Sequence, residues 1–422
     1  MRKLVLVIVL TLAAAPLATV SASERTMTKR QILNRVASAT GGRSSAALSG
    51  GGSASVFGDY DDDGRQDLAV GVPSEDGTAT RTSAVQIFYG TATGVVPGDT
   101  LLTEDMVTGG DTAEAGDGFG SSLAGGDFNG DGISDLAVGI PDEEVGATPN
   151  AGAVAIFMGS PLGITGTGDT QYLTQDDVPG FPEQLAEPND QFGSALVAGR
   201  FDTGPTWDLA VGAPFEDECD TCSDITEDAG IVNVFYGSAP SGLNPDTAVS
   251  LSQIDPLLNG TAEDGDTFGN SLAAGDLGKN GQMDLAIGSN EGVGDMQAAG
   301  AVNVVFGINQ NVLGTQTNGL FPLGDQMFTE ETPGVPGVAE DSNFFGSFGL
   351  AIADMAGTSK SDLIIGIPGE PVGGNDLGGM VLILRGGAKG VVTSGNRTYS
   401  QNSERPRHHA ARRPVRLPGR SR

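Results

Sequence analysis

The sequence contains few basic residues and almost no histidine. Its 422 residues include 22 Lys and Arg against 54 Asp and Glu, which gives a formal net charge of -32. A surface that binds nucleic acid needs clustered Lys and Arg, so this balance argues against a nucleic-acid partner and favours cations. The two histidines, His408 and His409, lie close to the C-terminus. A catalytic triad that uses imidazole is therefore excluded from the body of the chain.

Cysteine is also scarce, because the chain has only Cys219 and Cys222. The pair lies in an acidic stretch from Glu216 to Asp228, where the surrounding carboxylates disfavour a reactive thiolate. A small loop disulfide between the two is the predicted role. A two-thiolate metal site is the alternative, but it lacks further Cys or His ligands.

The two ends of the chain differ from its body. Residues 1–22 have the pattern of a secretory signal, with Arg2 and Lys3 at the start, an apolar run over 4–17 and small residues up to Ala22. The apolar run is too short for a membrane span. We therefore expect a secreted protein without a transmembrane segment, in an extracellular or periplasmic space.

Residues 23–50 are a predicted N-terminal linker, and residues 403–422 a basic tail. The tail is rich in Arg and Pro and has no apolar periodicity, so we expect it to be disordered. It begins where a sixth copy of the repeat described next would be due. This favours a truncated or frame-shifted C-terminus.

One sequence unit recurs five times at intervals of about 70 residues. A Phe-Gly pair precedes four of the copies, and an alternating apolar segment follows each of them. Each unit predicts four short strands, of which the first carries Phe-Gly and the second is buried on both faces. The anchor of each unit is an Asp-Leu pair, and it begins at Asp67, Asp135, Asp208, Asp284 and Asp362.

Units of this length predict an all-β propeller, in which each four-stranded sheet is a blade packed face to face with the next. Separate small domains are the alternative, but a lone four-stranded sheet cannot cover both of its apolar faces. The propeller is predicted over residues 51–402. Its blades are predicted at about 51–118, 119–191, 192–267, 268–344 and 345–402.

Two acidic loops stand directly before the first two anchors. Both have side-chain oxygens at positions 1, 3, 5 and 9 and Gly at position 6. Such a loop wraps a hard cation, with the backbone carbonyl of position 7 as a further ligand, and calcium fits it better than magnesium. An EF-hand is excluded because position 12 is Val instead of Glu, and a solvated acidic turn is the remaining alternative. The predicted ligands are Asp59, Asp61, Asp63, Arg65 and Asp67 in the first loop, and Asp127, Asn129, Asp131, Ile133 and Asp135 in the second.

The combined pattern of Phe-Gly, the acidic loop, Asp-Leu and Val-Gly-x-Pro resembles the FG-GAP repeat of integrin alpha-subunit heads. The last motif occurs at 70–73, 138–141 and 211–214. The resemblance covers residues 51 to about 402. It implies a seven-bladed propeller with calcium in the loop that joins the first two strands of some blades, and a role in adhesion or ligand binding. The first two loops of this chain match the calcium motif of that family.

The later copies depart from the family pattern. The third loop has Arg200 at position 1 and Gly204 at position 5, so we expect a positive side chain to replace the ion. The fourth loop keeps Asp276, Asn280 and Asp284 and predicts a weak site, and the fifth is expected to be empty. Five copies where the family has seven leave ring closure open, and we favour an incomplete propeller.

The sequence therefore predicts a calcium-binding adhesion or ligand-binding module, with an extracellular protein or a glycan as its partner. No catalytic residue and no enzymatic activity are predicted. The alternative is a hydrolase or lyase that uses carboxylates and calcium on the same scaffold. A carboxyl group with a raised pKa in an axial pocket would favour the enzyme.

Overall fold

The computed structural model of the chain describes residues 55–400, with gaps at 74–82, 111, 115, 167, 180–184, 220–224, 279, 313–314, 356, 358–359 and 373–377. The predicted signal, linker and basic tail lie outside the described residues.

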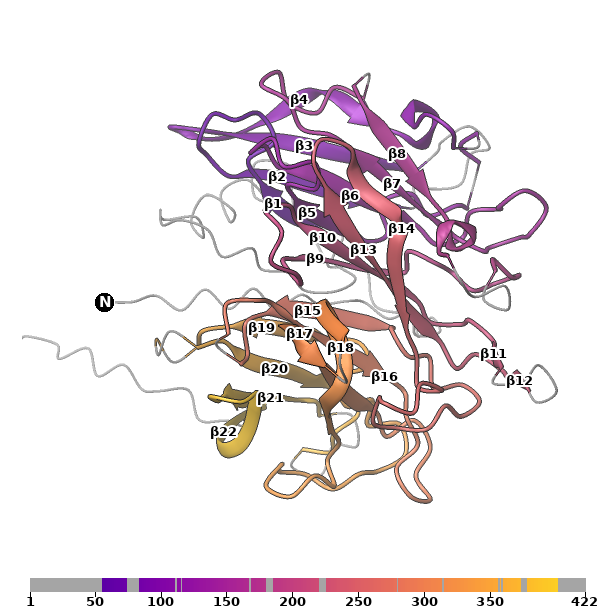
Figure 1. The fold of residues 1–422 in the computed structure, drawn as a ribbon, viewed down its shortest axis with the longest axis vertical. Helices are drawn as coiled ribbons and strands as arrows, with labels where there is room; N and C mark the ends of the chain where they lie inside the picture. The colour runs from indigo at the N-terminus through magenta and orange to yellow at the C-terminus, as the bar shows by residue number, and fades with distance from the viewer. Residues whose placement is uncertain are drawn as a thin grey trace, which may run out of the picture.

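In the described part of the chain, five four-stranded antiparallel sheets follow one another, and in each the strands pair in chain order (Figure 1). The first sheet consists of β1 (Ser55–Gly58), β2 (Asp67–Val72), β3 (Ala84–Thr91) and β4 (Gly94–Leu102). The second consists of β5 (Leu123–Gly126), β6 (Asp135–Ile140), β7 (Ala153–Phe157) and β8 (Thr170–Leu173). The third consists of β9 (Ala195–Gly199), β10 (Asp208–Ala213), β13 (Ile231–Ser238) and β14 (Gly242–Leu251). The fourth consists of β15 (Ser271–Gly275), β16 (Asp284–Ser289), β17 (Ala301–Val312) and β18 (Thr315–Phe328). The fifth consists of β19 (Leu350–Ala353), β20 (Asp362–Ile367), β21 (Met380–Gly386) and β22 (Val391–Ser400).

The five sheets are the blades of a propeller, which confirms the predicted fold class. Their first strands pack one against the next in the order β1, β5, β9, β15 and β19. Within the described residues, no strand of the first blade packs substantially on a strand of the fifth. The blades therefore form an arc whose first and last members stand apart (Figure 1).

Burial of the second strand differs between middle and end blades. Every residue of β6, β10 and β16 is buried, as the predicted two-faced burial requires. In β2 and β20 buried residues are interspersed with half-buried ones. The difference arises because an end blade has a neighbouring blade on one face only.

The Phe-Gly pairs do not lie in the first strands, so that part of our prediction was wrong. Phe119 and Gly120 precede β5, which begins at Leu123. Gly120 has a φ of +88°, a left-handed conformation that does not fit a strand. Its N–H donates to the carbonyl of Gly139 in the same blade, and the Phe119 ring is buried edge-on against Phe157. The pair is thus a turn that anchors the entry to the blade.

Within the described residues, a short hairpin and two single turns of 3-10 helix lie outside the blades. The insertion in the third blade forms a hairpin of β11 (Glu218–Cys219) and β12 (Ile225–Thr226), and Cys222 lies outside the described residues. Single turns of 3-10 helix, η1 (Glu104–Met106) and η2 (Gln175–Asp177), follow β4 and β8. In the part of the chain that the structure describes, no helix is long and apolar enough to cross a membrane.

Candidate metal centre

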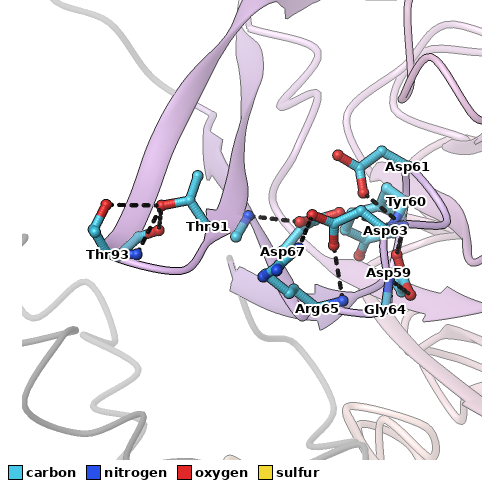
Figure 2. A network of polar contacts seen from close by, with 11 residues as sticks. Asp59, Tyr60, Asp61, Asp63, Gly64, Arg65, Asp67, Thr91 and Thr93 are labelled. Carbon is cyan, nitrogen blue, oxygen red and sulfur yellow. Dashed lines mark hydrogen bonds and ion pairs between the residues drawn. The ribbon is translucent and has the colours of Figure 1, made fainter.

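The first acidic loop joins β1 to β2 and gathers three of its carboxylates (Figure 2). One oxygen each of Asp59, Asp61 and Asp67 lies within 4.8 Å of the other two. Asp67 is buried, whereas Asp59 and Asp61 are half-buried. Oxygen atoms bound to one calcium ion at 2.3–2.6 Å are separated by up to about 5 Å, so this spacing suits a cation. The other acidic ligand predicted here, Asp63, forms a 2.6 Å ion pair with the exposed guanidinium of Arg65.

Backbone N–H groups hold this loop in its wrapped shape. The N–H of Gly64 donates to Oδ2 of Asp59 at 2.9 Å, and the N–H of Arg65 donates to Oδ1 of Asp63 at 2.8 Å. The N–H of Asp63 donates to Oδ1 of both Asp59 and Asp61 at 3.2 Å. Asp62 has a φ of +57°, and Gly64 at position 6 has a φ of +81°, which Gly adopts without steric cost.

The second loop, between β5 and β6, repeats this backbone pattern with a different side-chain arrangement. Gly132 N–H donates to Asp127 Oδ2 at 3.0 Å, and Ile133 N–H donates to Asp131 Oδ1 at 2.9 Å. The side-chain amide of Asn129 donates to Asp131 Oδ2 at 3.2 Å. Among the described residues, this loop does not bring three carboxylates as close together as the first loop does.

The aspartate at position 9 has the same contacts in all five blades. In the second blade, Asp135 Oδ2 accepts the N–H of Phe128 at 2.8 Å and Oδ1 accepts the N–H of Gly159 at 2.9 Å. Burial raises the pKa of Asp135 to about 7, and these N–H groups oppose that rise. The corresponding aspartates are Asp67, Asp208, Asp284 and Asp362. This residue therefore ties the hairpin to the third strand whether or not the loop is acidic, a role that our sequence analysis missed.

The later loops close through other groups. In the third blade, Arg200 Nη2 donates to the carbonyl of Gly204 at 2.9 Å, so its positive charge spans the loop. In the fourth blade, the side-chain amide of Asn280 donates to the carbonyl of Gly307 at 2.6 Å. In the fifth blade, Arg385 Nη1 lies 3.9 Å from Asp362 Oδ2. In each later loop, at least one position that corresponds to a predicted calcium ligand is therefore engaged in a contact with another group of the protein.

A polar cleft of about 700 Å³ lies between the hairpins of the third and fourth blades. Its lining includes Arg200, Thr203, Gln282 and Asn309. Because β1–β2-type and β3–β4-type hairpins lie at the same end of each blade, the cleft opens at the end that carries the acidic loops.

Comparison with known proteins gives the same repeat. The model of the FG-GAP repeat matches residues 51–88 and 119–157, which contain the first two acidic loops. Similar proteins include phosphatidylinositol-glycan-specific phospholipase D of Rattus norvegicus, 31% identical over 215 residues, and integrin alpha-PS2 of Drosophila melanogaster, 30% identical over 241 residues. Integrin alpha-7 of Mus musculus is 32% identical over 205 residues.

These alignments cover much of this chain and little of the relatives. They span 51%, 56% and 45% of this chain, but 23%, 15% and 14% of the three relatives in the same order. The likeness therefore concerns one part of each relative.

Proposed function

We propose that the chain, which contains FG-GAP repeats and folds as a β-propeller, is a secreted, calcium-stabilised module for adhesion or ligand binding. Its calcium ligands are those of the first two hairpins. These hairpins lie at one end of the blades, so calcium bound in them fixes the shape of the loops.

The observation that carries the calcium proposal is the grouping of Asp59, Asp61 and Asp67 within 4.8 Å. Three like charges at this distance repel one another in the absence of a counter-ion. A calcium ion relieves this repulsion and takes up the oxygens. The backbone hydrogen bonds of the loop hold the carboxylates in place before the ion arrives, which lowers the entropic cost of binding.

Calcium binding is tested by counting the ions bound per chain. The metal-free full chain is dialysed to equilibrium against calcium, and the bound ions are measured. Asp61→Asn is expected to lose one ion, because it removes one of the three grouped carboxylates. Asp202→Asn, at the matching third position of the third loop, is expected to bind as many ions as the unaltered chain. Equal ion counts for the unaltered chain and Asp61→Asn would contradict the assignment.

For the ligand, we propose the polar cleft between the third and fourth blades. Arg200 is one of only two basic residues between Thr82 and Ser359, so it marks this cleft as a place for an acidic group in a strongly acidic protein. The neighbouring exposed amide of Asn309 suits hydroxyl and carboxylate groups of a glycan or a protein loop, whereas the side-chain nitrogen of Gln282 already donates to two backbone carbonyls.

The cleft is tested with a panel of glycans and extracellular proteins, probed with the calcium-loaded chain. Arg200→Ala should weaken any interaction found in the panel at least tenfold, because charge-assisted hydrogen bonds are lost. Asp246→Ala, exposed on β14, is the control and should leave the interaction unchanged. Unaltered binding by Arg200→Ala would move the ligand site elsewhere.

The second candidate is an enzyme, and the similarity to a phospholipase D favours it. The chain is similar to integrins as well, over alignments of comparable length, and we prefer the binding role. Hydrolysis of a phosphatidylinositol-glycan by the purified, calcium-loaded chain would favour the enzyme. Absence of product at high enzyme concentration would support the binding module.

A further inference from the structure

Three carboxyl side chains are buried together where the first blade meets the second. Glu104 in η1, Asp117 ahead of Phe119, and Glu143 after β6 are 1%, 7% and 2% exposed. One oxygen of each lies within 4.8 Å of the other two. The hydroxyl of Tyr172 donates to Glu143 Oε1 at 3.1 Å. Neither oxygen of Glu104 accepts a hydrogen bond, although both are buried.

The same place recurs at the other three joints between blades, with one difference. Three residues meet at each joint between two consecutive blades. One follows the fourth strand of the first blade, and one is a Glu that follows the second strand of the next blade. The third lies two positions before the phenylalanine of the Phe-Gly pair of that next blade. The second joint has Gln175, Glu216 and Asp190, the third has Gln253, Glu291 and Asp266, and the fourth has Glu330, Glu370 and Asn343.

An amide group offsets the acids in each of these three joints. The side-chain nitrogen of Gln175 donates to Glu216 at 2.5 Å, and that of Gln253 donates to Glu291 at 2.5 Å. In the fourth joint, the amide of Asn343 donates to Glu330 at 2.5 Å. The first joint has three carboxyl groups and no amide, so it lacks the donor that its three counterparts possess.

We propose that a divalent cation of the calcium class binds between Glu104, Asp117 and Glu143 and joins the first two blades. Burying carboxylates without a compensating charge or donor costs several kcal/mol per ion, so an ionised Glu104 that accepts no hydrogen bond needs a positive group beside it. The oxygen separations match ligands at 2.3–2.6 Å from one ion. Carboxylates are the oxygen ligands that calcium prefers, and water can fill the remaining positions.

This site is separate from the acidic hairpins. The hairpins connect first to second strands, whereas Glu143 follows a second strand and Glu104 follows a fourth. In an antiparallel four-stranded sheet these two kinds of connection lie at opposite ends of the strands. The cation at the joint therefore stabilises packing between blades, and its binding does not depend on the hairpin loops.

The test compares the unaltered full chain with Glu104→Gln, which gives the first joint the amide that the second and third joints already have. Metal-free protein is titrated with calcium, and the bound ions are counted by equilibrium dialysis. Glu104→Gln is expected to bind one ion fewer. In chelator its melting temperature should exceed that of the unaltered chain, because the amide replaces the missing counter-charge.

The converse variant, Gln175→Glu, makes the second joint all-acidic and should bind one ion more than the unaltered chain. Asp61→Asn serves as the reference for the hairpin site, and its loss of an ion should add to that of Glu104→Gln. Unchanged ion counts in both joint variants would overturn the proposal. A higher melting temperature of Glu104→Gln with an unchanged ion count would also overturn it, because protons would then hold the joint together.

Discussion

The glycine in the second strand of each blade provides a direct test of blade packing. In the third blade, a Cβ added to Gly212 would overlap the carbonyl oxygen of Gly269, which belongs to the next blade. In the fifth blade, a Cβ on Gly366 would lie near Gly349 of its own blade alone, 3.3 Å from its carbonyl oxygen and 3.9 Å from its Cα. Neither glycine has a left-handed φ, so backbone strain does not distinguish them.

The two substitutions should therefore differ in cost. Gly212→Ala forces β10 away from the Phe-Gly turn of the next blade, and overpacking of this kind costs about 1–3 kcal/mol. We expect about 3 kcal/mol because the obstacle is backbone and cannot change rotamer. Gly366→Ala displaces no neighbouring blade and reduces the freedom of the unfolded chain, an effect of about 0.4–1 kcal/mol in the stabilising direction. Its net effect should lie within about 1 kcal/mol of zero.

Urea unfolding measures this difference, with the fluorescence of the single tryptophan, Trp207, as the probe. Trp207 is half-buried and packs against the core shared by the second and third blades. Gly212→Ala should lower the midpoint, whereas Gly366→Ala should leave it nearly unchanged. Equal destabilisation by both variants would refute the reasoning, because it would mean that the fifth blade also has a neighbour on its far face.

Three further predictions concern carboxylates. Calcium at a hundred times its dissociation constant should stabilise the chain by about 2.7 kcal/mol per site, and a melting curve of Asp61→Asn should show a smaller calcium response than that of Asp202→Asn. Asp208→Ala should cost about 2–4 kcal/mol in urea unfolding, although its loop is not acidic, because one buried and two partly buried backbone N–H groups lose their acceptor. An unchanged midpoint would contradict this. Burial raises the pKa of Glu291 to about 7, against about 4.3 in an unfolded chain. The folded chain therefore holds this proton more tightly, so the contribution of Glu291 to stability in chelator should be full below about pH 4 and should fall as the pH rises to 7. Glu291→Gln should flatten that part of the stability profile, and a profile identical to that of the unaltered chain would show that Glu291 is not responsible.

Most of the fold could be predicted from the sequence because its repeat is local. The Asp-Leu anchors and the alternating segments fix the four strands of a blade, and a sheet with two apolar faces needs neighbours on both sides. The acidic loops from Asp59 and Asp127 are also local, since nine consecutive residues contain all candidate side chains. The Phe-Gly pair is predicted in a strand because phenylalanine is common in strands. The left-handed φ of its glycine depends on the tertiary structure and is not evident from the amino-acid sequence.

The sequence by itself determined the number of blades, the order of their strands and the two loops that could hold a cation, because these depend on spacing within one unit. Only the tertiary structure decided which side chains meet between units. Glu104, Asp117 and Glu143 come from three separate segments, and nothing in their local sequence distinguishes them from the other acidic residues. Their burial in one joint results from the packing of one blade on the next. The same packing decides why the glycine of the second strand is needed in the first four blades. The position-9 aspartate recurs in blades whose loops have lost their acidic pattern because it joins the hairpin to the third strand of its own blade.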